Sequence, residues 1–169
     1  MKHLKRFNEN NNSELIQKLK EYGIENYTIN SDGTIDVDGN VNLHDRGLTQ
    51  IPFNFRNVTG YFHCGSNLLT SLKGCPKDVG EYFYCTYNKL KNLIGGPQLV
   101  YGDYWCNYNE LETLEGCAGD IKGGFNCSCN KLTDLDCSSV IEGDIECRGN
   151  GFLEEPYFYG FVGKKIIWK

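Results

Sequence analysis

A unit of about 21 residues repeats six times through the middle of this chain, and no other feature constrains the fold as strongly. One column of equivalent positions contains only valine and isoleucine: Val37, Val58, Val79, Val100, Ile121 and Ile141. A second apolar column follows four residues later: Val41, Phe62, Phe83, Tyr104, Phe125 and Ile145. Because a unit this short can bury its apolar side only against its neighbours, the period predicts a solenoid of stacked turns.

Cysteine dominates a third column, two residues further on: Leu43, Cys64, Cys85, Cys106, Cys127 and Cys147. The alternation of Val58, Phe62 and Cys64 predicts a short strand with one buried face. An asparagine follows three residues after each cysteine, with Arg46 in its place in the first unit: Asn67, Asn88, Asn109, Asn130 and Asn150. Since a buried amide can bond backbone groups of its own turn and of the adjacent turn, we expect a ladder of asparagines along the solenoid.

Two further columns are mostly leucine: Leu48, Leu69, Leu90, Leu111, Leu132 and Phe152, then Ile51, Leu72, Leu93, Leu114 and Leu135. The spacing from Phe62 to Leu72 resembles the leucine-rich-repeat pattern L-x-L-x-x-N-x-L-x-x-L, with cysteine replacing the second leucine. The resemblance extends over about residues 37–155 and implies a right-handed leucine-rich-repeat solenoid with an extended return side, as in short-repeat effectors of enteric bacteria. The motif F-x-C-x-x-N-x-L and the opening nine residues are also similar to uncharacterised repeat proteins of large tailed bacteriophages.

An open solenoid exposes its core at both ends, so we expect a cap on each side of the repeats. The N-terminal cap, residues 1–36, combines a short amphipathic helix from Ser13 to Gly23 with a hairpin around Ser31-Asp32-Gly33. The solenoid is then 37–155 and the C-terminal cap 156–169, which gives a mostly β protein with one short helix. The helix could instead bind a partner. We expect the aromatic residues after Pro156 to fold over the last turn; left exposed, they would form a patch for dimerisation or a partner.

The chain contains nine cysteines, which in a secreted protein would indicate a disulfide scaffold. Here most occupy core columns, including a second one formed by Cys75, Cys117 and Cys137, so we interpret them as small buried hydrophobic residues. The N-terminus lacks the hydrophobic run of a signal peptide and no apolar stretch could span a membrane, which predicts a cytoplasmic protein. Only Cys127 and Cys129 have a metal-like spacing, so we expect no metal and no cofactor.

Acidic residues concentrate in the second half of the solenoid. Residues 100–147 contain ten acids and two lysines, which gives 2 − 10 = −8, whereas the whole chain has a net charge of −5. This excess argues against binding to duplex nucleic acid. Alternatively, the acids only keep the repeat array soluble and monomeric.

In the family that the repeats resemble, strand positions between core residues point to a concave face. Three such positions flank each cysteine, and their aromatic members fall on the second to fourth units, with an acid beside them: Tyr61, His63, Tyr82, Tyr84, Tyr87, Trp105, Tyr108 and Asp103. Because adjacent strands lie about 4.8 Å apart, we expect one continuous aromatic patch with an acidic flank.

Exposed tyrosines around a tryptophan are typical of protein-binding hot spots, although cross-strand aromatic pairs also stabilise sheets. We therefore expect a monomeric, non-enzymatic module that binds another protein, a host or defence factor if the phage resemblance holds. The alternatives are a sink for a nucleobase-like ligand stacked on Tyr84, Trp105 and Tyr108, or a structural component of a virion. Catalysis is not expected, because no catalytic motif recurs and His63 lies about three strand spacings, roughly 14 Å, from Cys129.

Overall fold

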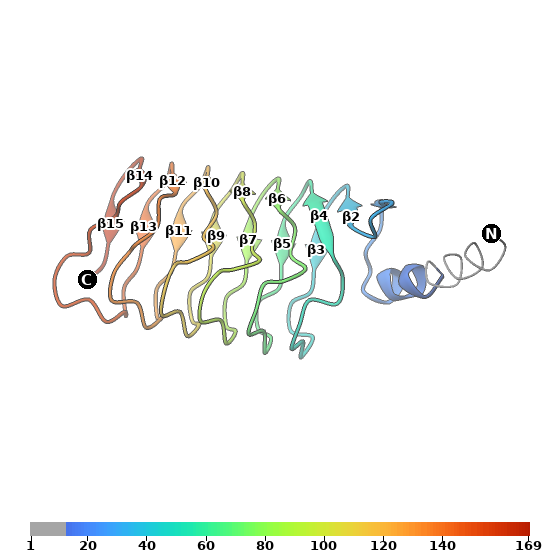
Figure 1. Cartoon of the computed structure of the whole chain (residues 1–169), viewed down its shortest axis with the longest axis horizontal. Coiled ribbons are helices and arrows are strands. Elements are labelled where there is room, and N and C mark those ends of the chain that lie inside the picture. The colour runs from blue at the N-terminus through green and yellow to red at the C-terminus, as the bar shows by residue number, and fades with distance from the viewer. Residues whose placement is uncertain (1–12) are drawn as a thin grey trace.

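In the computed structural model each sequence repeat forms one turn, and successive turns stack on one another (Figure 1). The structure describes residues 13–169. The protein is a mostly β solenoid of about six turns of about 21 residues with one short N-terminal helix, which confirms the predicted fold class. Its turns stack side by side along a nearly straight line in Figure 1. Neighbouring turns pair in parallel, with equivalent residues such as Val58 and Val79 opposite each other.

Each turn contributes strands to two different sheets. The eight strands of the first sheet, in spatial order, are β1 (Tyr27–Ile29), β2 (Ile35–Val37), β4 (Phe55–Val58), β6 (Asp78–Val79), β8 (Leu99–Val100), β10 (Asp120–Ile121), β12 (Val140–Ile141) and β14 (Phe161–Val162). The seven strands of the second sheet are β3 (Val41–Asn42), β5 (Phe62–His63), β7 (Phe83–Tyr84), β9 (Tyr104–Trp105), β11 (Phe125–Asn126), β13 (Ile145–Glu146) and β15 (Ile166–Ile167).

The prediction of a single strand through Val58, Phe62 and Cys64 was therefore wrong. Val58 ends β4 and Phe62 begins β5, and the chain bends between them. At this bend a Cβ on Gly60 would lie 2.8 Å from the Gly39 carbonyl oxygen of the preceding turn. The close approach of two turns leaves little room for a side chain at Gly60, although the next turn makes the same bend with Glu81 at the equivalent position.

The predicted apolar columns form the core. The rings of Phe62 and Phe83 stack at 5.8 Å, and the rows of valine and leucine pack beside them. All five cysteines of the third column are buried free thiols, as expected for small hydrophobic residues.

The asparagine ladder is present and connects each turn to the previous one. Asn88 Nδ2 donates to the carbonyl oxygens of Cys64 and Cys85 at 3.0 and 3.2 Å, and its Oδ1 accepts from Leu69 N at 2.9 Å. The ladder reaches the first turn, where Arg46 N donates to Asn67 Oδ1 at 3.0 Å. These amides satisfy backbone groups at the bend after each strand of the second sheet.

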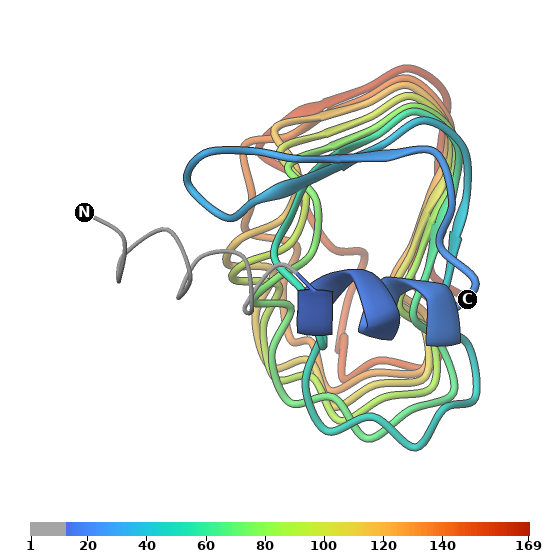
Figure 2. The same cartoon turned by 90° about the vertical axis from the view of Figure 1, so that its right-hand side faces the viewer.

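The N-terminal cap has the predicted helix and hairpin. Residues 13–21 are helical and lie across the open end of the first turn (Figure 2), where Leu19 is completely buried. Strands β1 and β2 pair antiparallel, with Tyr27 opposite Val37. The opening residues 1–9, which carry part of the phage resemblance, lie outside the described residues.

The segment 156–169 differs from the expected cap, because it continues the solenoid. Val162 and Ile166 lie 21 residues after Ile141 and Ile145 and pair with them in β14 and β15. Phe158 is buried and bridges Leu135, whereas Tyr157 and Tyr159 remain about 70 % exposed. Backbone pairing with the previous turn holds the segment in register, so its tyrosines project outward instead of folding over the end.

Candidate binding face

The residues predicted to bind a partner lie in three backbone settings. The position before the cysteine lies on the strands of the second sheet: His63 on β5, Tyr84 on β7 and Trp105 on β9. The position three before the cysteine, with Tyr61, Tyr82 and Asp103, lies at the bend that precedes these strands. The position two after the cysteine, with Tyr87 and Tyr108, lies in the turn that follows them.

Strand pairing aligns the first group into a continuous row. His63 lies opposite Tyr84, and Tyr84 opposite Trp105, with ring centroids 5.2 and 4.9 Å apart. Tyr82 stacks on Tyr84 with centroids 5.8 Å apart and planes within 7° of parallel. We call His63, Tyr84 and Trp105, together with Tyr82 stacked on them, the strand row. Tyr82 and Trp105 are 43 % and 40 % exposed, so the strand row presents aromatic ring surface to solvent.

Tyr87 and Tyr108 form a separate stack. Their ring centroids are 4.4 Å apart, their planes lie within 5° of parallel, and they are 54 % and 46 % exposed. No ring contact joins this tyrosine stack to the strand row within residues 13–169. The predicted residues therefore form two aromatic groups, the strand row and the tyrosine stack. Tyr61 lies in the bend one turn before Tyr82.

The tyrosine stack sits on an unfavourable backbone conformation. Tyr87 and Tyr108 have φ angles of 53° and 55°, in the left-handed region. The same position in other turns carries Asp45, Ser66, Cys129 and Gly149, also with positive φ. The position lies in this turn and not on the strand, where the repeat pattern predicts it. Its small and polar residues in the other turns are the sequence sign of a left-handed turn. A non-glycine residue there costs roughly 1–2 kcal/mol, and bulky side chains are rare.

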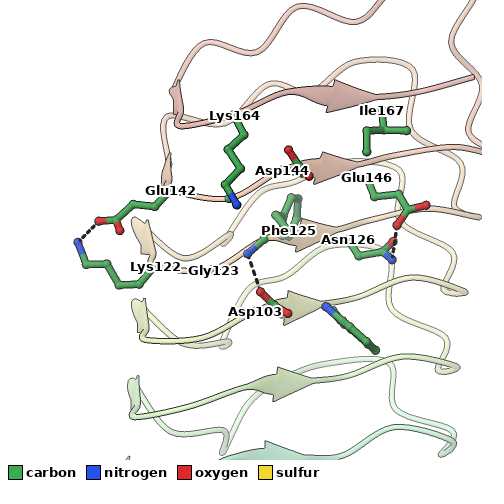
Figure 3. A pocket seen from close by; sticks show the side chains of 13 residues that line it. Asp103, Lys122, Gly123, Phe125, Asn126, Glu142, Asp144, Glu146, Lys164 and Ile167 are labelled. Carbon is green, nitrogen blue, oxygen red and sulfur yellow. Dashed lines mark hydrogen bonds and ion pairs between the residues drawn. The ribbon is translucent and has the colours of Figure 1, made fainter.

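A cleft of about 540 Å³ adjoins Trp105 on the C-terminal side of the strand row. Figure 3 shows carboxylates from neighbouring turns around it, among them Asp103, Asp144 and Glu146. Asp103 Oδ1 accepts from Gly124 N at 2.7 Å, which fixes this carboxylate beside the bend. The predicted acidic flank is therefore a hollow next to the tryptophan.

Two lysines that sequence analysis did not assign to the site also line this cleft. Lys122 Nζ lies 2.9 Å from Glu142 and 2.8 Å from Asp120, while Lys164 extends from the last turn towards the cleft (Figure 3). Lys164 reaches the cleft only because 156–169 adds a further turn. The lining therefore combines both signs of charge, with acids in excess.

His63 is held by its own turn and by a second histidine. Its Nδ1 accepts from Gly65 N at 3.2 Å, and its ring meets that of His44 edge to face at 4.5 Å. Burial, together with the neighbouring His44, lowers the pKa of His63. Because Nδ1 accepts a backbone hydrogen bond, this imidazole is neutral where the contact is intact.

No group of three or more histidine, cysteine or acidic side chains within residues 13–169 is arranged to hold a metal ion. Over the same part of the chain, none of the helical structure has the length and apolar character needed to cross a membrane. Comparison with protein-family models, curated proteins and solved structures found no match to this chain.

Proposed function

We propose that this protein is a non-enzymatic binding module that recognises another protein through the strand row and the tyrosine stack. The observation that carries the proposal is the tyrosine stack itself. Two large rings are kept on left-handed positions where Asp45, Ser66 and Gly149 serve in other turns. Backbone strain that persists on an exposed surface is a common mark of functional sites.

Sheet stability alone accounts poorly for these residues. A favourable cross-strand aromatic pair contributes about 0.2–1 kcal/mol, which does not exceed the cost of two non-glycine residues in the left-handed region. Moreover, Tyr87 and Tyr108 lie after the strands and remain about half exposed. Buried against a partner, both rings would lose their exposed area and offset the strain.

The composition of the face supports a protein as its ligand. Tyrosine and tryptophan dominate protein-binding hot spots because they bury large areas with few rotatable bonds. The resemblance of the repeats to leucine-rich repeats and to tailed-phage proteins points to the same class of ligand. On that resemblance, the protein would bind a bacterial host factor and inhibit an enzyme or a defence component.

The test is capture from a bacterial lysate with matched variants. The face variant combines Tyr84→Ala, Trp105→Ala and Tyr108→Ala, and the control variant combines Tyr101→Ala, Tyr157→Ala and Tyr159→Ala, which removes exposed tyrosines elsewhere. We expect one protein retained by the wild type and the control variant and lost by the face variant. Equal retention by both variants, with both folded by circular dichroism, would contradict the proposal.

The cleft beside Trp105 supports a second candidate, a small aromatic ligand stacked on the indole. The surrounding carboxylates favour a neutral or cationic ring over a phosphorylated one. Quenching of tryptophan fluorescence by free nucleosides, abolished by Trp105→Ala, would favour this candidate. We expect no saturable quenching if the ligand is a protein.

A further inference from the structure

Cys117 and Cys137 lie at equivalent positions of neighbouring turns, shortly before β10 and β12. Each lies four residues before an isoleucine of the paired register, Ile121 in β10 and Ile141 in β12. Their local turns differ, because Cys117 N donates to Leu114 O three residues earlier and Cys137 N to Leu135 O two residues earlier, both at 2.9 Å. Because β10 and β12 pair in parallel, the two turns are separated by about one strand spacing, roughly 4.8 Å. That separation is within the Cα distances that a disulfide can bridge, about 4.4–6.8 Å.

Side-chain contacts bring the two sulfur atoms together. The Cys117 and Cys137 thiols interact with each other, and Cys137 Sγ lies 3.3 Å from Ser139 Oγ. The Ser139 hydroxyl donates to Ala118 O at 2.6 Å, so it connects the residue before β12 to the residue after Cys117. The Cys117 and Cys137 side chains therefore already face each other across the two turns in the reduced protein.

None of the other seven cysteines is both partly exposed to solvent and next to a second partly exposed cysteine. Those of the core column are completely buried, and burial raises the pKa of thiols such as Cys85 and Cys106 well above the usual value. Cys75 has Cys64 as a neighbouring thiol, but both side chains are buried, and burial raises the pKa of Cys75 well above the usual value. Cys129 has Tyr108 and Gly149 as its column neighbours.

Cys137 is the more acidic member of the pair. Both side chains are partly exposed, unlike the core cysteines. Donation from the Cys117 thiol lowers the pKa of Cys137 to about 6, and the same contact raises that of Cys117. A thiolate is the nucleophilic form of cysteine, so Cys137 is suited to attack and Cys117 to resolve.

We propose that Cys117 and Cys137 are an oxidation site that forms a disulfide across the turns on reaction with a hydroperoxide. The Cys137 thiolate attacks one peroxide oxygen, the O–O bond breaks, and the released hydroxide is protonated to water. Cys117 sulfur then attacks the resulting sulfenic acid, an S–S bond replaces the S–O bond, and the hydroxide leaves as water with the Cys117 proton. Two thiols are oxidised by two electrons, and hydrogen peroxide is reduced to two waters.

The bond would link two turns where the repeat is irregular. Ile121 and Ile141 are 20 residues apart, one fewer than in the other units. Neither cysteine belongs to the strand row or the tyrosine stack, so the proposal does not depend on the binding function. Closing this loop restricts the unfolded chain, and we expect the oxidised protein to unfold at a higher temperature.

The experiment treats the folded full chain with hydrogen peroxide, blocks the remaining thiols, and maps peptides after cleavage at lysine, arginine and glutamate. This digestion places Cys117 on 116–122 and Cys137 on 132–142, each without another cysteine. We expect a linked pair of these peptides, two hydrogen atoms lighter than their sum and separated by reductant. Oxidation of other cysteines while this pair stays reduced would overturn the proposal.

Variants test the assigned roles. Cys117→Ser should leave a Cys137 sulfenic acid that dimedone traps, whereas Cys75→Ser, from the same column, should form the disulfide as the wild type does. A measurement on the wild type needs no variant to fold: iodoacetamide should label Cys137 at least tenfold faster than the core cysteines. Equal labelling rates in the folded protein would refute the assignment of Cys137 as the attacking thiol.

Discussion

Replacing Asn88 with alanine tests whether the asparagine ladder holds the turns together. The Asn88 amide accepts from Leu69 N and donates to the carbonyl oxygens of Cys64 and Cys85. It also donates at 3.3 Å to Thr86 O, which has a shorter bond from Ser66 N at 2.9 Å. In the variant, Leu69 N–H would lose its partner in a buried position. The carbonyls of Cys64 and Cys85 would each keep one donor, because Asn67 also bonds Cys64 O and Asn109 also bonds Cys85 O.

The cost follows from this count of partners. An orphaned buried N–H costs about 1–3 kcal/mol and each weakened carbonyl about 0.5 kcal/mol, so we expect Asn88→Ala to lower the free energy of unfolding by about 2–4 kcal/mol. Asn88→Asp should be worse at neutral pH. Its carboxylate can still accept from Leu69 N, but it places negative charge against the carbonyl oxygens of Cys64 and Cys85.

Urea denaturation followed by circular dichroism would measure these differences. Asn54→Ala is the matched control, since Asn54 is exposed, and it should change the free energy of unfolding by less than about 0.5 kcal/mol. If Asn88→Ala proved no more destabilising than Asn54→Ala, the amide contacts would contribute nothing to stability and the reasoning would fail. An Asp variant more stable than the Ala variant would refute the electrostatic part.

Three further predictions concern other positions. Tyr104→Phe should raise the free energy of unfolding by about 1 kcal/mol, because the buried Tyr104 hydroxyl has only the Cys85 sulfur, a weak acceptor, beside it; a loss of stability in urea would contradict this. Tyr87→Gly should be more stable than Tyr87→Ala in the same assay, by about 1 kcal/mol, because glycine adopts the left-handed φ of 53° without strain. The pKa of His63 is lowered in the folded state, so as the pH falls the unfolded chain takes up the proton at a higher pH than the folded protein does. The free energy of unfolding should therefore fall as the pH drops below the usual histidine value of 6.5. His63→Gln should flatten this dependence.

Several features of the solenoid follow from the order of residues alone. The period of the valine, phenylalanine and cysteine columns predicts stacked turns, and the asparagine after each cysteine predicts the ladder. Helix and hairpin signals before Val37 also agree with the structure. These predictions hold because each depends on which residue types recur, and burial of a repeated apolar position leaves little choice of fold.

Contacts between turns decided the remaining features. The bend at Gly60 arises where one turn approaches the backbone of the next, so alternation of apolar residues could not locate it. The final turn was missed because Glu155 and Pro156 break the leucine column, although Val162 and Ile166 keep the 21-residue spacing and pair with the preceding turn.

The candidate site likewise depends partly on the sequence and partly on contacts between turns. The aromatic residues and their columns are evident in the sequence, as are the acids near Trp105. Their separation into a strand row and a tyrosine stack depends on where each strand ends and the left-handed turn begins. The period determines which side chains recur along the axis, whereas backbone packing between adjacent turns determines the direction in which each of them points.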